Sequence, residues 1–136
     1  MNVSLVSSIT PDLEELWTHA RKDVLAKRGG VALMTTLCGS CAESELLADV
    51  VASSSLWSVR DDGLLIGIGI FRQSVVEALY VAPTSRRQKV ATTLVRALIA
   101  SNTPPLDAYA LPGDRAMKSL FESLGWKARL LTMRGV

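Results

Sequence analysis

The stretch from residue 75 to residue 99 restricts the possible folds more than any other part of the sequence. It begins with the strand pattern VVEALYV, which ends before Pro83 because proline cannot donate to a sheet ladder. A short basic loop leads directly into a helix. The apolar face of that helix carries Val90, Leu94, Ala97 and Leu98. A strand that leads into an apolar-faced helix indicates an α/β domain with the helix packed on the sheet.

The loop before this helix predicts a binding site for an anion. The first N–H groups of a helix have no partners within it, and that end carries a partial positive charge. Arg86, Arg87 and Lys89 add charged donors, while Ala91 and Thr92 are small enough for a ligand to approach the backbone. Residues 61–136 contain ten basic and six acidic side chains, against five and seven in residues 1–60. A solvated basic face is the alternative interpretation of this charge.

Composition narrows the class of protein. The 136 residues fit one domain, residues 1–136. Aromatic residues make up only 5%, which favours a small polyphosphate ligand over a nucleic acid. No apolar run approaches the roughly 18 residues of a membrane helix, so we expect no membrane span. The N-terminal sequence shows no secretion signal, which favours a cytoplasmic location.

Two cysteines, Cys38 and Cys41, form one C-x-x-C spacing. With His19 as the only histidine, a tetrahedral metal site lacks ligands, and we expect no metal. If residues 31–37 formed a strand, the pair would precede a helix, an arrangement that lowers the pKa of a thiol. Thiol redox catalysis and incidental buried thiols both remain open.

The rest of the chain adds further elements. Val3 to Ile9 suggests a strand, and Thr10 with Pro11 starts an amphipathic helix that ends near Gly29. Residues 31–51 form a second helical region. Two strands surround the turn at Asp61, Asp62 and Gly63, and Gly67 and Gly69 within the second are close-packing positions. A strand at 106–111, a helix at 114–124 and a strand at 127–134 complete the pattern.

The segment LYVAPTSRRQKVATTLVRAL resembles the coenzyme A-binding motif of the GCN5-related N-acetyltransferase (GNAT) superfamily. The family's loop reads Arg/Gln-x-x-Gly-x-Gly/Ala, in which Arg86 matches the first position and Ala91 the last. GDRAMKSLFESLGW is similar to the family's second motif. The resemblance implies an α/β fold with a mixed, mostly antiparallel central sheet, flanking helices and a splay between strands four and five.

The resemblance also implies a site. Acetyl-CoA would be the cosubstrate, and its pantetheine arm would pair with the backbone of Leu79 and Val81 in the splay. The loop and the first turn of the helix would hold the pyrophosphate through Arg86, Arg87, Gln88, Lys89, Val90, Ala91 and Thr92. Glu77 is the candidate general base, and Tyr80 or Tyr109 the candidate acid. Glu77 as a solvent-facing strand residue is the alternative.

Three positions depart from the family pattern: Lys89 replaces a glycine, Asp114 an asparagine, and Phe121 the tyrosine that commonly acts as the acid. The main hypothesis is an acetyl-CoA-dependent N-acyltransferase acting on an amine of a small molecule or protein. The alternative is a catalytically impaired domain that binds acyl-CoA or a protein partner without turnover.

The amine acceptor has no recognisable motif. The acidic residues Glu43, Glu45 and Asp49 suggest a cationic amine, and a solvated helix explains them equally well. An exposed C-terminal strand could pair with a second copy and form a homodimer.

Overall fold

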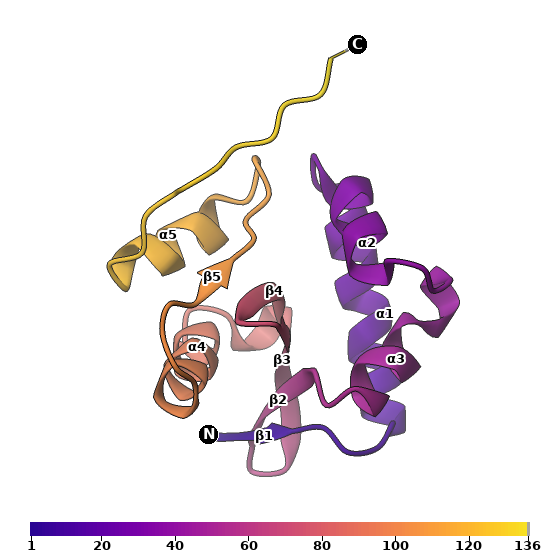
Figure 1. Cartoon of the computed structure of the whole chain (residues 1–136). Helices are drawn as coiled ribbons and strands as arrows, with labels where there is room; N and C mark the ends of the chain where they lie inside the picture. Colours follow the sequence, from indigo (N-terminus) through magenta and orange to yellow (C-terminus); the bar gives the residue numbers. More distant parts are fainter. Residues whose placement is uncertain (136) are drawn as a thin grey trace.

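The computed structural model describes residues 1–135, and they form a five-stranded sheet with helices on both faces (Figure 1). The strands lie in the order β1-β2-β3-β4-β5, and only the contact between β4 and β5 is parallel. The elements are β1 (Asn2–Leu5), α1 (Pro11–Ala26), α2 (Gly30–Cys38), the 3-10 helix η1 (Glu43–Glu45), α3 (Leu46–Ala52), β2 (Leu56–Asp61), β3 (Leu64–Arg72), β4 (Val75–Val81), the 3-10 helix η2 (Pro83–Ser85), α4 (Val90–Ser101), β5 (Asp107–Ala108) and α5 (Arg115–Ser123). The expected fold class is therefore confirmed.

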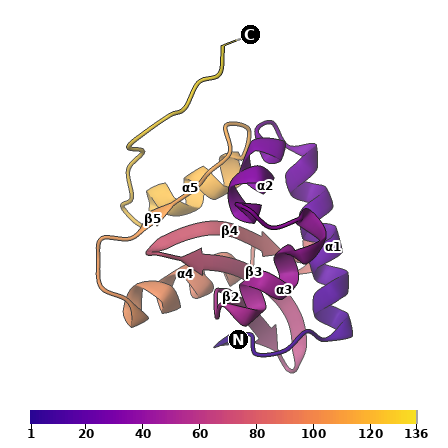
Figure 2. The ribbon, with the colours of Figure 1, turned by 45° about the vertical axis from the view of Figure 1, so that its right-hand side comes forward.

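The sheet divides the apolar core into two layers. On one face, α1, α2 and α3 cover β3, with Leu13, Met34, Leu46 and Ile68 among the buried residues. On the other face, α4 and α5 bury Val76, Leu94, Leu98 and Phe121. Figures 1 and 2 show α4 and the three N-terminal helices on opposite sides of the central strands. Each face of the sheet thus has its own helical cover.

The β2–β3 hairpin and the two glycines of β3 agree with the sequence prediction. Asp62 and Gly63 connect the strands with φ of 49° and 81°, the conformation of a two-residue type I′ turn. A Cβ added at Gly67 would lie 2.9 Å from the Val90 side chain, and one at Gly69 would lie 2.8 Å from Leu94. Both glycines therefore allow α4 to pack closely on β3.

β4 and β5 separate soon after they begin. Val75 pairs with Asp107 and Val76 with Ala108, and β5 then ends. The strand expected at 106–111 is thus shorter than its sequence pattern. Within the described residues, β4 has no strand partner on this side from Glu77 to Val81. This is the expected splay.

The C-terminal prediction is wrong. Residues 127–135 form no strand and extend away from the folded body (Figure 1). Leu130, Leu131 and Met133 are 89%, 69% and 80% exposed. Apolar residues at this density are typical of a strand, but a strand needs a partner, and this segment has none among residues 1–135.

The N-terminal predictions hold with shorter bounds. The first strand ends at Leu5 instead of Ile9, and α1 ends at Ala26. Residues 31–51 are helical as expected, divided among α2, η1 and α3. No helix of the described chain has both the length and the apolar composition needed to cross a bilayer.

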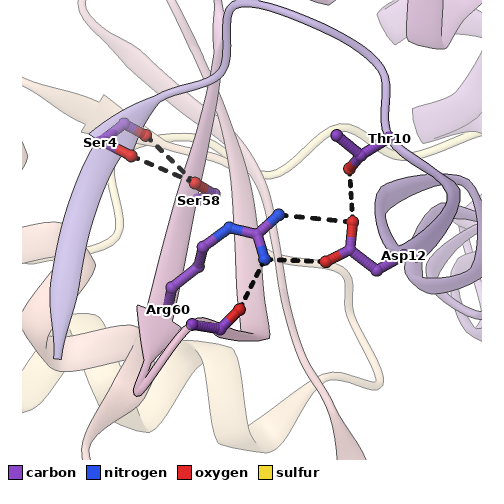
Figure 3. Close-up of polar contacts among 6 residues, drawn as sticks. Ser4, Thr10, Asp12, Ser58 and Arg60 are labelled. Atoms are coloured by element: carbon purple, nitrogen blue, oxygen red, sulfur yellow. Dashed lines mark hydrogen bonds and ion pairs between the residues drawn. The ribbon is translucent and has the colours of Figure 1, made fainter.

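A polar cluster fastens α1 to the sheet (Figure 3). The Arg60 guanidinium on β2 donates to both carboxylate oxygens of Asp12, at 2.8 and 3.4 Å, and to the Gly63 carbonyl. The Thr10 hydroxyl also donates to Asp12 instead of capping α1. The hydrogen bonds from Arg60 and Thr10 lower the pKa of Asp12 from 3.8 to about 2. Asp12 therefore stabilises the fold only in its charged form.

This contact predicts a loss of stability in acid. Because the pKa of Asp12 is lower in the folded chain than in the unfolded chain, its contribution is complete above about pH 4 and disappears as the pH falls to about 2. The pair is exposed, so we expect a contribution of at most about 1 kcal/mol. Urea unfolding at pH 6 and pH 2.5 should show a smaller loss for Asp12→Asn than for the wild type. An equal loss in both proteins would contradict the assignment.

Candidate active site

The open edge of β4 presents backbone groups to the splay. The Ala82 N–H donates to Ile66 on β3, so the neighbouring peptide groups of Val81 and Leu79 point the other way, as alternation along a strand requires. The Arg86 Nε donates to the Val81 carbonyl at 3.1 Å, from the side opposite β3. Leu79 and Val81 therefore expose the groups that a chain-like ligand could pair with.

The basic loop leads from this edge to the N-terminus of α4. The side chains of Arg86, Arg87, Gln88 and Lys89 are exposed. Among residues 1–135, no carboxylate lies within ion-pair distance of the three cationic ones. The N–H groups of Val90, Ala91 and Thr92, in the first turn of α4, have no partner within the helix. Positive charge and free amides thus meet at one end of the splay, an arrangement that suits a pyrophosphate.

Lys89 caps α4 in a left-handed conformation, with φ of 62° and ψ of 28°. Glycine adopts this region at no steric cost, whereas an L-residue loses about 1–2 kcal/mol there. The backbone therefore keeps the shape that a glycine would give, although the side chain is a lysine. Its exposed ammonium is free to reach an anion at the end of the helix.

We expect Lys89→Gly to stabilise the fold by about 0.5–1 kcal/mol. Relief of the left-handed strain exceeds the extra chain entropy that glycine brings to the unfolded state. Thermal unfolding should show a midpoint a few degrees higher. Gln88→Gly is the matched control, because Gln88 is exposed and its φ is not positive, so it should gain nothing. Equal effects of the two substitutions would contradict this explanation.

Glu77 occupies a bulge in β4. Ile70 pairs with Ala78 and Phe71 with Val76, which leaves Glu77 as the extra residue. In such a bulge the two residues opposite one partner lie on the same face. Glu77 thus joins Ala78 on the face covered by α1–α3, with its side chain only 12% exposed. The solvent-facing alternative is therefore wrong for Glu77.

Arg72 positions the Glu77 carboxylate, a role that no sequence pattern indicates. Its guanidinium binds Glu77, donates to the Leu37 carbonyl at 2.8 Å and lies 3.7 Å from Asp49. Arg72 is the last residue of β3 and lies beside a tight turn, a position where an arginine is ordinarily exposed to solvent. Arg72 pairs with Val75 across the turn, and Glu77 lies two residues further along β4 on the same face, so the hairpin brings the two side chains together.

The two candidate tyrosines occupy different places. Tyr80 is half-buried on the face of β4 that α1–α3 cover, the same face as Glu77, and the Arg86 guanidinium lies 5.5 Å from its ring centre. Tyr109 follows β5, is 41% exposed, and its N–H donates to the Val76 carbonyl. Tyr80 is thus on the side of Glu77, while Tyr109 stands where the two strands separate.

Phe121 and Asp114 have structural explanations. Phe121 is buried in the second core layer, with its ring centre 4.8 Å from that of Trp126. Asp114 caps α5 by accepting from the Met117 N–H at 3.0 Å, and it also binds Lys27 at the end of α1. Aspartate and asparagine are equally good helix caps, so this departure preserves the start of α5.

The cysteine pair does not have the redox arrangement. Residues 30–38 form helix α2, so Cys38 ends a helix instead of preceding one. Burial, with the nearby Cys41, raises the pKa of the Cys38 thiol. The interpretation as strand, C-x-x-C and helix is wrong, and a raised pKa makes Cys38 a poorer nucleophile.

A comparison with models of protein families gives a match over most of the chain. Residues 12–126 match the model of the acetyltransferase (GNAT) family. No curated protein matches the chain in sequence. The match spans the splay, the basic loop and Glu77, and it ends just before the exposed tail.

Solved structures share the fold at low sequence identity. A GNAT-family acetyltransferase from Streptococcus agalactiae has a TM-score of 0.66 at 14% identity, covering 93% of this chain and 84% of that one. An aminoglycoside 6'-N-acetyltransferase from Acinetobacter haemolyticus has a TM-score of 0.62 at 16% identity, covering 100% and 97%. An aminoglycoside N-acetyltransferase in complex with CoA has a TM-score of 0.59 at 15% identity, covering 99% of both chains. At these identities the likeness concerns the fold alone.

Proposed function

Because the chain belongs to the acetyltransferase (GNAT) family, we propose that it transfers an acetyl group from acetyl-CoA to an amine bound beside β4. The observation that carries the proposal is the splay, which leads from the free amides of α4 past Leu79 to the Glu77 carboxylate. One continuous edge thus offers a place for a pyrophosphate, a pantetheine arm and a proton acceptor.

Acetyl-CoA is the cosubstrate and supplies the acetyl group as a thioester. The open edge and the uncompensated positive loop fit its two ends. The α4 amides, with Arg87 and Lys89, would hold the pyrophosphate, while Leu79 and Val81 would pair with the pantetheine amides. Arg86 would exchange its contact with the Val81 carbonyl for the ligand.

Glu77 would accept the proton of the attacking amine, and Tyr80 would donate a proton to the leaving thiolate. An attacking amine must be neutral, and a carboxylate within reach can accept its proton directly or through a water. Arg72 keeps Glu77 in one place for this purpose. Tyr80, on the same face, has a hydroxyl proton that can pass to the leaving thiolate, which Phe121 cannot supply.

A domain that binds acyl-CoA without turnover is the second candidate, favoured by the burial of Phe121 at the position of the family's usual acid. An assay of CoA release distinguishes the two candidates, whereas binding of acetyl-CoA does not. Acetyl-CoA should raise the unfolding temperature of both, because a ligand that binds only the folded state adds RT ln(1 + [L]/Kd), about 2.7 kcal/mol at a hundredfold excess over Kd. Release of free CoA in the presence of amines occurs only with the enzyme. No stabilisation by millimolar acetyl-CoA would contradict both of these candidates and leave a domain that binds a protein partner.

Association with a second copy also belongs to the proposal. The exposed Leu130, Leu131 and Met133 form an unpaired segment, and the outer edge of β5 has no partner within the described residues. Strand pairing between copies would cover both. Light scattering should therefore show a dimer that becomes a monomer when residues 127–136 are removed. A monomeric full chain would contradict it.

A further inference from the structure

A small pocket lies between the N-terminal helices and the sheet, on the face where Glu77 sits. Its volume is about 40 Å³. One water-sized position takes about 10–15 Å³, so the pocket has room for a short branched alkyl group. Trp17, Met34, Leu37, Ile70, Ala78 and Tyr80 contribute to its walls.

The pocket is next to the proposed proton acceptor. Ala78 follows Glu77 in the chain, and the bulge places both on one face. The Leu37 side chain lines the pocket, while its carbonyl accepts from the Arg72 that binds Glu77. A group in the pocket is therefore a direct neighbour of an amine that gives its proton to Glu77.

The arginines in and around the pocket are already paired with carboxylates of the protein. Of the described residues that line it, none is acidic, and the charged one is Arg21, which binds Glu43. Asp49 lies beside Arg72, which also holds Glu77. Two of the three acidic residues that suggested a cationic acceptor, Glu43 and Asp49, thus face arginines, and the third, Glu45, does not line the pocket. A second ammonium on the acceptor would find no free carboxylate at the pocket.

We propose that the acceptor is a small monoamine whose apolar substituent occupies this pocket. The inference rests on the proposed function and adds the class of acceptor. An alkyl group in the pocket loses contact with water and gains contact with apolar side chains, whereas a buried second ammonium would lose its hydration without a partner. The structure thus favours a short aliphatic amine over polyamines and polycationic amino sugars.

Two amines with the same number of heavy atoms provide the test: 3-methylbutylamine and 1,4-diaminobutane. They differ in whether the far end is apolar or charged. With saturating acetyl-CoA, we expect kcat/KM for 3-methylbutylamine to be at least tenfold higher, within the range that pocket contacts of this size give. Equal values, or a preference for the diamine, would overturn the inference while leaving the transferase function intact.

A variant that fills the pocket sharpens the test. Ala20 is 9% exposed on α1 and lines the pocket, so Ala20→Leu should occupy part of its volume. We expect the ratio of kcat/KM for 3-methylbutylamine to kcat/KM for 1,4-diaminobutane to fall at least tenfold. Stabilisation by acetyl-CoA shows whether this variant is folded. The wild-type comparison decides the inference if it is not.

Separate measurements of acetyl-CoA binding and amine binding distinguish a failure of the inference from a failure of the proposed function. If acetyl-CoA stabilises the protein but calorimetry with CoA present detects no binding of 3-methylbutylamine at 10 mM, the acceptor class is wrong and the CoA-binding function stands. If acetyl-CoA does not bind, the proposed function fails, and amine binding to the free protein then decides the role of the pocket by itself.

Discussion

Glu77→Gln should lower the rate of acetyl transfer by about 10²–10⁴-fold, the usual contribution of a general base, without changing the affinity for acetyl-CoA. Glutamine has the shape of glutamate and can still accept from Arg72 through its amide oxygen, so the bulge and the pocket wall remain. It cannot take the proton of the attacking amine. The measurement is the release of free CoA under steady-state conditions, beside a titration of acetyl-CoA followed by thermal unfolding.

A matched control separates catalysis from a general effect of removing an acid. Glu122→Gln makes the same change on α5, where the side chain is 59% exposed and its contact with Lys118 is long, at 3.9 Å. We expect activity within twofold of the wild type. A Glu77→Gln variant that also stays within twofold would show that Glu77 serves only to hold Arg72, and another group would have to be the base.

Local sequence determines the loop and the start of α4, where we propose that the cofactor binds, and these elements are predictable from the sequence. The start of α4 depends on Pro83, a basic loop and an apolar repeat, all within twenty residues of one another. Lys89 departs from the family's glycine in the sequence itself, although its left-handed φ of 62° is visible only in the structure. The hairpin turn at Asp62 and Gly63 is equally local.

The surroundings of Glu77, the proposed general base, depend on pairing between strands, and the sequence alone does not predict this pairing. The sequence places Glu77 on a strand, yet the bulge at this residue, which puts Glu77 and Ala78 on one face of the sheet, is visible only in the structure. The pairing of Arg72 with Val75 across the turn brings Arg72 beside Glu77. An extra residue in a strand reverses the face of its neighbours without any change in residue type.

The wrong predictions have the same origin. Residues 127–134 have the composition of a strand, but a strand forms only when it pairs with an edge, and in the described structure this segment pairs with none, although the outer edge of β5 is open. Likewise, the C-x-x-C spacing carries no information on which side the helix lies. The structure places Cys38 at the end of α2, where a thiolate gains nothing from the helix dipole.

Ala91→Glu should abolish the stabilisation that acetyl-CoA gives, with a loss of affinity greater than about a hundredfold. Ala91 is the second residue of α4, and its amide is one of the free donors at the helix end. A glutamate there brings its own carboxylate to these donors and repels the pyrophosphate. At an effective dielectric constant near 20, two unit charges 4 Å apart repel by about 4 kcal/mol, more than the 2.7 kcal/mol that a hundredfold loss requires.

The fold should survive this substitution, because an acidic residue in the first turn of a helix interacts favourably with the helix dipole. Ala100→Glu is the control: it makes the same change on the exposed surface of α4, far along the helix from the loop. It should leave the thermal shift with acetyl-CoA unchanged. Adenosine diphosphate, which carries the pyrophosphate without the pantetheine arm, should bind the wild type and fail to bind Ala91→Glu. If both variants retain the full shift, the α4 N-terminus does not hold the pyrophosphate, and the ligand must enter the splay by another route.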